Sequence, residues 1–265
     1  MKENVLQGRT ALVTGASSGL GAEFARQLAA MGCHLILVAR RADSMEKLKE
    51  EIGGRHPVDV TVIPMDLAAR DAPQALYDQV RQLGKSVDVL INNAGLGLYG
   101  NFLDIPWEKE RAMLELDVIA LTHLTRLFAQ EMIGRHFGYI LQIASIGAYQ
   151  PSPMYASYSA AKSYVLYYSE AIRYELRKTN VSVTTLSPGV TRTEFHQSAG
   201  QDSYTRYQRL AIMESPQVAA IGLKAMLNRR PSVVAGRLNS LAAFLTRFTP
   251  RMASAAVAHR TMTVK

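Results

Sequence analysis

Seven short apolar segments, rich in valine, isoleucine and leucine, recur along the chain with helix-like stretches between them. Each segment is largely apolar and too short for a helix, which favours buried strands over strands with one solvated face. Such strands are typical of parallel sheets covered by helices on both faces. The sequence therefore predicts a doubly wound α/β sandwich around a central parallel sheet of about seven strands. The segments are RTALVTG, CHLILVA, VDVTVIP, VDVLINNAG, GYILQIAS, VSVTTLSPG and PSVVAG.

We interpret residues 1–265 as a single domain. The 265 residues are 48% hydrophobic and 20% charged, which is enough apolar material for a core of this size. No internal repeat, low-complexity segment or linker divides the chain. The polar segment of about 195–214 contains Gly200 and lies between a strand and a helix, so we expect a mobile lid over the substrate. Residues from about 237 to 265 form a C-terminal extension without a strong pattern.

Apolar side chains in the lid and the extension leave two interpretations open. They pack these segments onto the body or a neighbouring subunit, or they line a pocket for a bulky apolar substrate. These side chains are Phe195, Tyr204, Tyr207, Leu210, Ile212 and Met213 in the lid, and Leu238, Leu241, Phe244, Leu245 and Phe248 in the extension.

Charge and cysteine content argue against several classes of protein. The formal net charge is +8, but the basic residues are scattered and do not cluster with aromatic platforms, so we expect no nucleic-acid binding. The single cysteine, Cys33, has no partner for an intrachain disulfide, and no Cys/His cluster has the spacing of metal ligands. The sequence shows no signal peptide and no apolar run long enough to span a bilayer. We expect a cytoplasmic protein without a structural metal.

A glycine-rich loop follows the first predicted strand. Gly15, Gly19 and Gly21 have the spacing G-x-x-x-G-x-G, and a helical stretch begins directly after them. Glycines at such a turn let the backbone approach a pyrophosphate, whose charge is favoured by free N–H groups at the helix start. The alternative is a turn that binds nothing. At the first strand-to-helix turn of a parallel α/β chain we favour dinucleotide binding. The expected contacts are Gly15, Ser17, Ser18, Gly19, Leu20 and Gly21.

Two arginines end the second predicted strand, where many dinucleotide-binding proteins carry an acid for the ribose 2′-OH. A guanidinium cannot accept a hydrogen bond from that hydroxyl, whereas it binds a 2′-phosphate well. Arg40 and Arg41 therefore favour NADP(H) as the cofactor, the alternative being two solvated arginines. Asp43, a competing acid, is interpreted as a helix N-cap. Asp66 and Leu67, after the third strand, suit a contact to the adenine, although a strand-end Asp without a ligand would look the same.

Tyr158 and Lys162 lie one turn apart at the start of a predicted helix, so the phenol and the ammonium share one face. A phenol with an ordinary pKa of about 10 is a poor acid or base at neutral pH, and a nearby cation lowers that pKa. Tyr158 is therefore a candidate acid and base for a carbonyl or alcohol. Ser145 ends another strand at the same sheet edge, where its hydroxyl can stabilise charge on the substrate oxygen.

These motifs together resemble the short, single-domain form of the short-chain dehydrogenase/reductase family. TGASSGLG, NNAG at 92–95, Ser145, the Tyr158/Lys162 pair and SPGVTRT at 187–193 follow one another in the family's order and spacing. The resemblance implies a Rossmann-like fold, Tyr158 as the acid/base and Lys162 on the nicotinamide ribose. It also implies homodimers or homotetramers formed through helices at roughly 110–135 and 158–177. Further cofactor contacts implied by the resemblance are Asn93, Ala94, Gly95, Pro188, Gly189, Val190, Thr191 and Thr193.

One position departs from the family's pattern. Asp117 stands where the family usually has an asparagine, the fourth member of a proton-relay tetrad that acts largely through its backbone carbonyl. Asp117 is therefore expected to preserve the relay. If its carboxylate is ionised and close to Lys162, it also changes the titration of the tyrosine.

The expected function is NADP(H)-dependent reduction of a ketone or aldehyde, or oxidation of the corresponding alcohol. The expected catalytic residues are Ser145, Tyr158, Lys162 and Asp117. The alternative is a non-catalytic NADP(H)-binding sensor or scaffold, which only Asp117 favours.

Overall fold

The central sheet has seven strands in the order β3-β2-β1-β4-β5-β6-β9, and every neighbouring pair is parallel. The computed structural model describes residues 5–201 and 203–263. The seven apolar segments form these strands, and the predicted doubly wound sandwich is confirmed. The strands are β1 (Thr10–Thr14), β2 (His34–Ala39), β3 (Val60–Pro64), β4 (Val89–Asn92), β5 (Gly138–Ile143), β6 (Val181–Ser187) and β9 (Ser232–Val234).

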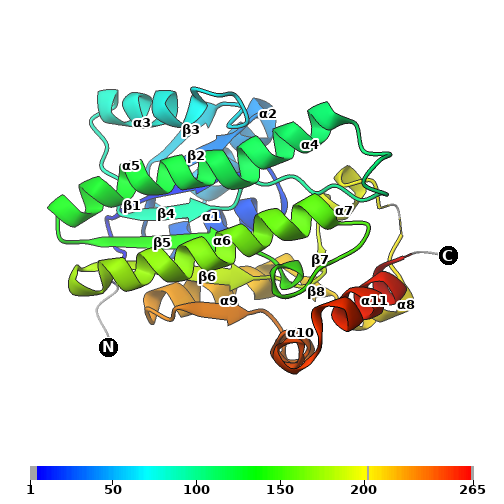
Figure 1. Cartoon of the computed structure of the whole chain (residues 1–265). Coiled ribbons are helices and arrows are strands. Elements are labelled where there is room, and N and C mark those ends of the chain that lie inside the picture. Colours follow the sequence, from blue (N-terminus) through cyan, green and yellow to red (C-terminus); the bar gives the residue numbers. More distant parts are fainter. Residues whose placement is uncertain (1–4, 202, 264–265) are drawn as a thin grey trace.

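Helices cover both faces of this sheet (Figure 1). On the near face in that view lie α4 (Trp107–Leu114), α5 (Leu121–Gly134) and α6 (Ala156–Glu175), with α3 (Ala72–Gln82) packed beside α5. The opposite face is covered by α1 (Gly19–Ala30), α2 (Ala42–Gly53) and α9 (Ser215–Leu227).

The core has two layers, one on each face of the sheet, because side chains along a strand point alternately to the two faces. Leu12 and Ile36 point into the cluster beneath α3 and α5, whereas Val13 and Leu37 point into the cluster beneath α1 and α9. All four side chains are fully buried. Successive strand residues alternate between the two faces, so both residues of each pair must be apolar. This is the physical reason for the continuous apolar segments in the sequence.

The strand order reverses direction between β1 and β4. From β1 the chain continues outward to β2 and β3, and then returns to the other side of β1 as β4. In open α/β sheets ligands bind at the carboxyl ends of the strands where this reversal leaves a crevice. The fold therefore places the loops after β1, β4 and β5 around one crevice.

Two additional regions adjoin that edge. Between β7 (Thr191–Arg192) and β8 (Met213–Glu214), which pair with each other, lie the short helices α7 (Phe195–Ser198) and α8 (Arg206–Leu210). The chain ends with α10 (Arg237–Leu245), a 3-10 turn η4 (Thr246–Phe248) and α11 (Arg251–Met262), and α11 packs against α8. None of the helices within the described residues is long and apolar enough to cross a membrane.

One local prediction is wrong. Asp43 does not cap a helix, because α2 begins at Ala42 with Arg41 at the N-cap position. Asp43 lies instead in the first helical turn, where its negative charge is favourable next to the helix N-terminus.

Candidate active site

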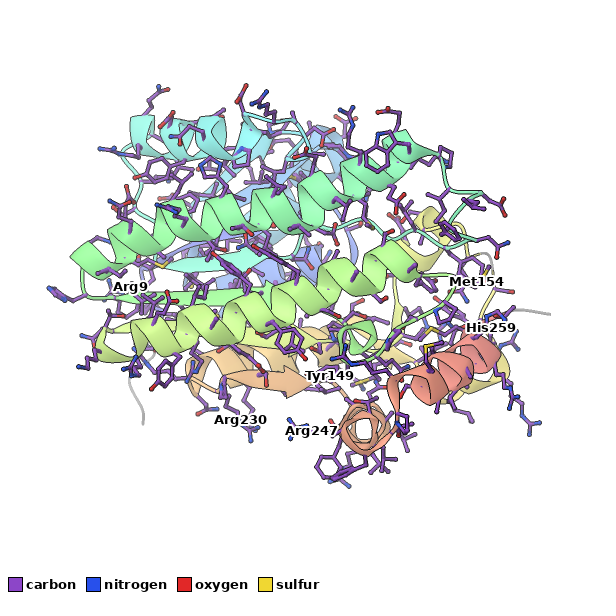
Figure 2. All side chains as sticks on the ribbon, viewed as in Figure 1. Arg9, Tyr149, Met154, Arg230, Arg247 and His259 are labelled. Carbon is purple, nitrogen blue, oxygen red and sulfur yellow. The ribbon has the colours of Figure 1, made fainter. Side chains whose placement is uncertain are left out.

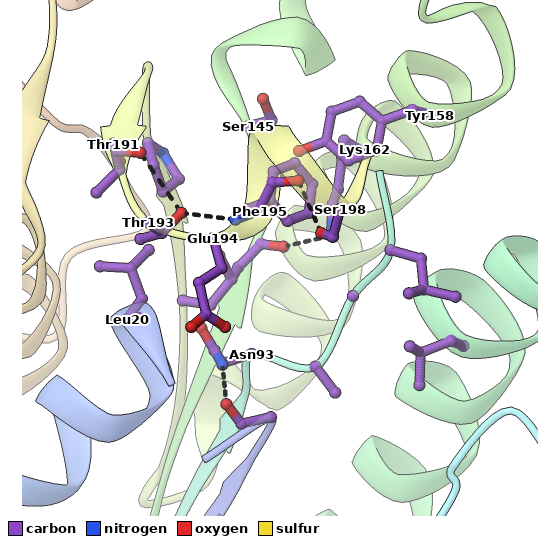
Figure 3. Close-up of a pocket in the computed structure, with 18 of the residues that line it drawn as sticks. Leu20, Asn93, Ser145, Tyr158, Lys162, Thr191, Thr193, Glu194, Phe195 and Ser198 are labelled. Carbon is purple, nitrogen blue, oxygen red and sulfur yellow. Dashed lines mark hydrogen bonds between the residues drawn. The ribbon is translucent and has the colours of Figure 1, made fainter. Parts of the chain in front are cut away.

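A cavity of about 450 Å³ opens at the carboxyl edge of the sheet, within the range of small-molecule sites (Figure 3). It is lined by the loops that follow β1, β2, β3, β4, β5 and β6. All of the predicted site residues except Gly21 and Asp117 form its wall. These are Gly15, Ser17, Ser18, Gly19, Leu20, Arg40, Arg41, Asp66, Leu67, Asn93, Ala94, Gly95, Ser145, Tyr158, Lys162, Pro188, Gly189, Val190, Thr191 and Thr193.

The glycine loop brings the start of α1 up to the cavity. Gly19 has a φ of +55°, a left-handed conformation that favours glycine. Gly21 lies behind the loop, where a Cβ atom would be 2.1 Å from the carbonyl oxygen of Gly15. Ser18 is the N-cap residue of α1, but its side chain does not cap the helix. The first turn of α1 therefore offers free N–H groups to an anion.

Asn93 fixes the two strands at the reversal point. Its side-chain Nδ2 donates to the carbonyl oxygen of Thr14 at 2.9 Å. The backbone N–H groups of Asn93 and Ala94 both donate to the Thr14 hydroxyl, at 3.0 and 2.9 Å. These bonds connect the end of β1 to the end of β4 and hold the glycine loop against the cavity.

Arg41 is held by three partners around the glycine loop. Its guanidinium donates to the hydroxyl of Ser18 at 2.7 Å and to that of Ser17 at 3.3 Å. It also forms an ion pair with Glu194 at 3.1 Å. Glu194, which Figure 3 shows among the cavity residues, was missed by the sequence analysis because its contact with Arg41 spans 153 positions. Arg40, by contrast, is exposed and has no ion pair within the described residues 5–201 and 203–263.

Asp66 and Leu67 differ in what they present to the cavity. Asp66 is exposed, and its carboxylate accepts a hydrogen bond from the backbone N–H of Ala68 at 3.1 Å. Leu67 is buried at 4% exposure and packs into the core beneath α3 and α5. The carboxylate is therefore the group of this pair that remains available to a polar ligand.

Ser145 and Tyr158 meet at the other end of the cavity (Figure 3). Ser145 lies two residues beyond β5 and caps the 3-10 turn η2 (Ile146–Tyr149), where its Oγ accepts from the N–H of Gly147 at 3.1 Å. Its own hydroxyl hydrogen remains available to a ligand, and the Ser145 hydroxyl lowers the pKa of the nearby Tyr158 phenol. The Nζ of Lys162, one turn further along α6, is 5.7 Å from the centre of the Tyr158 ring.

Asp117 forms a buried ion pair with Lys162. Its Oδ2 is 2.9 Å from Lys162 Nζ, and the side chains are 0% and 5% exposed. Each partner also has a hydrogen bond of its own, since Lys162 donates to the Ile143 carbonyl at 3.1 Å and Asp117 Oδ1 accepts from the Leu96 N–H at 2.8 Å. The Asp117 carboxylate therefore contacts Lys162 directly, whereas the resemblance implied a role mainly for the backbone carbonyl.

A π-helical segment carries Asp117 to this position. The segment η1 (Glu115–Ala120) joins α4 to α5 without a break. A π-helical turn holds one more residue than an α-helical turn, and such turns are frequent at functional sites. The sequence predicted a long helix over roughly 110–135 but contained no signal for this wider turn.

Burial controls the titration of all three groups. It raises the pKa of the Tyr158 phenol, which outweighs the lowering by Lys162 and Ser145, and Asp117 raises that pKa further. Burial lowers the pKa of Lys162, but Asp117 and Tyr158 together outweigh this effect and keep the pKa above its ordinary value. The pKa of the Asp117 carboxyl is raised by burial and partly restored by Lys162. Lys162 lowers the pKa of the phenol, as expected from the sequence, but burial has the larger effect and the pKa of Tyr158 lies above its ordinary value.

The segment predicted as a lid contributes only part of its apolar side chains to the cavity. Phe195 lines it and lies 5.6 Å, centre to centre, from the Tyr158 ring, whereas Leu210 is 72% exposed. The side chain of Tyr207 lies outside the described residues. In the C-terminal extension, Met262 reaches the cavity. The five apolar residues predicted from the sequence of the extension are 51% to 73% exposed and do not line the cavity; they are Leu238, Leu241, Phe244, Leu245 and Phe248.

Comparison with known proteins gives consistent matches. Residues 9–203 match the family model described as short chain dehydrogenase. Nodulation protein G of Rhizobium sp. (strain N33) is 32% identical over 91% of this chain and 94% of its own. The structure of a short-chain dehydrogenase from Sphingobium yanoikuyae in complex with NADPH is 28% identical, with a TM-score of 0.79 over 91% of this chain and 94% of that one. A short-chain dehydrogenase/reductase from Burkholderia phymatum in complex with NAD shares the fold at 22% identity and a TM-score of 0.82, over 98% of both chains.

The buried ion pair leads to a prediction about stability without any ligand. Lys162→Met leaves the Asp117 carboxyl buried without its counter-ion, and breaking a buried pair in this way costs about 3–5 kcal/mol. The free energy of unfolding, from denaturant titration near neutral pH, should fall by that amount. Adding Asp117→Asn to Lys162→Met should recover much of the loss, because an amide oxygen still accepts from Leu96. A double variant as unstable as Lys162→Met alone would contradict the ion pair.

Proposed function

This chain belongs to the short-chain dehydrogenase/reductase family of oxidoreductases, and we propose that it uses NADP(H) to reduce a ketone or aldehyde, or to oxidise the corresponding alcohol. The observation that carries the proposal is the meeting of Ser145, Tyr158 and Lys162 at one end of a cavity whose other end suits phosphate groups. A sensor or scaffold that only binds NADP(H) has no need for that arrangement of hydroxyl, phenol and ammonium.

Several features fit a dinucleotide. The free N–H groups at the start of α1 suit the pyrophosphate, and Arg40 and Arg41 suit a 2′-phosphate beside the adenosine. Arg41 already pairs with Glu194, so Arg40 is the cation with its charge free for a phosphate. Lys162 suits the nicotinamide ribose, and the loop at Pro188 and Gly189 suits the carboxamide. The bound nicotinamide supplies or accepts the hydride.

Tyr158 moves the proton in this proposal. The phenol donates to the oxygen of the carbonyl as negative charge develops there, and Ser145 donates a hydrogen bond to the same oxygen. Since burial raises the pKa of Tyr158, the phenol stays protonated at neutral pH, which is the form that reduction needs. Asp117 acts through Lys162, because it fixes the ammonium and adds negative charge near the phenol.

The substrate end of the cavity favours an apolar carbonyl compound. Leu96, Ile146, Phe195 and Met262 line it, together with the aromatic ring of Tyr155. Pockets for apolar ligands have mainly such walls, with a few polar groups that fix the orientation. A ketone of moderate size with apolar substituents fits this lining better than a highly hydroxylated sugar.

The outer faces of α5 and α6 suit a homo-oligomer. Four large side chains on or next to these helices are exposed, namely Ile119 at 53%, Tyr164 at 40%, Tyr167 at 66% and Tyr174 at 67%. Exposed apolar surface of this kind is usually covered by a partner. A homodimer or homotetramer formed through these helices is the proposed assembly.

The first test of the function concerns the cofactor. Charge-assisted hydrogen bonds contribute about 1.5–3 kcal/mol, so NADPH should bind roughly 10- to 100-fold more tightly than NADH. Arg40→Asp should reverse this preference, whereas Arg70→Asp, at an exposed position outside the cavity, should leave it unchanged. Titration calorimetry measures both affinities. Equal affinities in the unmodified protein would show that the cofactor assignment is wrong.

The second test concerns the proton. Tyr158→Phe keeps the ring but removes the phenol proton, so kcat should fall by about 10²–10⁴. The affinity for NADPH should stay near that of the unmodified protein. Tyr164→Phe, at an exposed phenol on the same helix, is the matched control and should retain activity. If Tyr158→Phe retains more than about half of the activity, another group is the acid and base.

The third test concerns Asp117. Its carboxylate raises the pKa of Tyr158, so Asp117→Asn should lower that pKa. Alcohol oxidation needs the phenolate, and the rising limb of kcat/KM against pH should therefore move to lower pH in Asp117→Asn. Substantial activity should remain, because asparagine keeps the acceptor for Leu96. Asp71→Asn, at an exposed carboxylate outside the cavity, should cause no shift. An unmoved limb, or complete loss of turnover in a folded variant, would contradict this role.

A further inference from the structure

The net charge of the chain is concentrated in its C-terminal part. From residue 215 to the end, the sequence contains eight lysines and arginines and no aspartate or glutamate. These eight positive charges equal the formal net charge of +8 for the whole chain, so residues 1–214 contain equal numbers of basic and acidic side chains. The basic residues look scattered when counted along the sequence, but only the C-terminal part has no acids to neutralise them.

The same region exposes an unusual amount of apolar surface. Of the nine residues of α10, only Asn239 and Ala243 are buried. The side chains that point outward are large, and Phe244 and Phe248 contact each other edge to face with ring centres 5.4 Å apart. The exposed fractions are 64% for Leu238, 55% for Leu241, 52% for Phe244, 51% for Leu245, 73% for Phe248 and 81% for Met252. We call these six side chains the C-terminal apolar face.

The helices that carry the C-terminal apolar face are well packed on their inner sides. Asn239, on the inner side of α10, donates to the Ala235 carbonyl at 2.8 Å and packs against Gly189. On α11, Ser254 and Ala258 are buried, and the Thr261 carbonyl accepts from the Thr205 hydroxyl at 2.7 Å. The inner sides of both helices are thus fixed to the body, while the C-terminal apolar face points outward.

Arginines border the C-terminal apolar face. Arg237 begins α10, Arg247 lies in η4 and Arg251 begins α11, and none of the three is buried. None of them has an ion pair within residues 5–201 and 203–263. Figure 2 shows Arg247 beside α10, at the lower edge of the molecule. Exposed leucine and phenylalanine bordered by long cationic side chains are typical of helices that lie in a membrane interface.

We propose that the C-terminal apolar face docks on a bilayer that contains anionic phospholipids. The apolar side chains enter the boundary between headgroups and acyl chains, and the bordering arginines bind the lipid phosphates. A second copy of this chain fits less well, because symmetric pairing would bring basic residues together without any acid from this region to neutralise them. The docking does not depend on the proposed activity.

The test is co-sedimentation of the full chain with lipid vesicles. Phosphatidylcholine vesicles with about one third phosphatidylglycerol should bind the protein, pure phosphatidylcholine should bind it much less, and added salt should weaken binding. Phe244→Ser/Phe248→Ser and, separately, Arg247→Glu/Arg251→Glu should each lower the partition coefficient at least about tenfold. The matched controls are Phe102→Ser/Leu103→Ser and Arg70→Glu/Lys178→Glu, at exposed positions elsewhere, which should bind as the unmodified protein does.

Circular dichroism and thermal melting identify any variant that fails to fold. Absence of binding to the anionic vesicles by the folded, unmodified protein would overturn the proposal. Equal losses in the control variants would also overturn it, because binding would then follow overall charge or hydrophobicity. If light scattering shows that Phe244→Ser/Phe248→Ser reduces the oligomer size while vesicle binding is absent, a second copy covers this face instead. Binding only to an acidic protein would likewise replace the lipid as the partner.

Discussion

The buried pair of Lys162 and Asp117 is the constraint on which the site depends. Two charges taken out of water are costly unless each finds its counter-charge and further hydrogen bonds. Here the Ile143 carbonyl and the Leu96 N–H supply those bonds, so four elements meet at one point: α6, η1, β5 and the loop after β4. A change in any of them moves the ammonium. The pair therefore holds the Lys162 Nζ at 5.7 Å from the centre of the Tyr158 ring.

Electrostatics divide the cavity into two ends. Near the glycine loop, free N–H groups, Arg40 and Arg41 create a positive region, in which Glu194 neutralises part of Arg41. At the other end, burial raises the pKa of Tyr158 and keeps the phenol protonated. The glycine-loop end of the cavity thus favours an extended anionic ligand, and the Tyr158 phenol at the other end is a proton donor. One parallel sheet places both ends together, because its strands all end at the same edge.

Local sequence patterns predicted the strands and nearly all of the cavity wall, because both are set by the apolar segments and the residues directly after them. Long-range contacts could not be predicted in the same way. Asp117 was singled out, but it lies in a π-helical turn that has no sequence signature, and its contact with Lys162 spans 45 positions. The Glu194 and Arg41 pair joins positions 153 residues apart. The exposure of Phe244 and Phe248 was missed because apolar residues at helical spacing normally indicate packing.

The most direct test of the proposed function is to follow the transferred hydride with an isotope label. The protein is incubated with NADPH that carries deuterium at both hydrogen positions of the nicotinamide C4, together with a panel of ketones, aldehydes, sugars, steroids and 3-oxoacyl thioesters. Mass spectrometry then locates the deuterium. We expect deuterium on the new carbinol carbon formed from an apolar carbonyl compound. Tyr158→Phe should form about 1% or less of the product that the unmodified protein forms in the same time. Tight binding of NADPH without transfer to any carbonyl compound, or equal transfer by Tyr158→Phe, would contradict the proposed function.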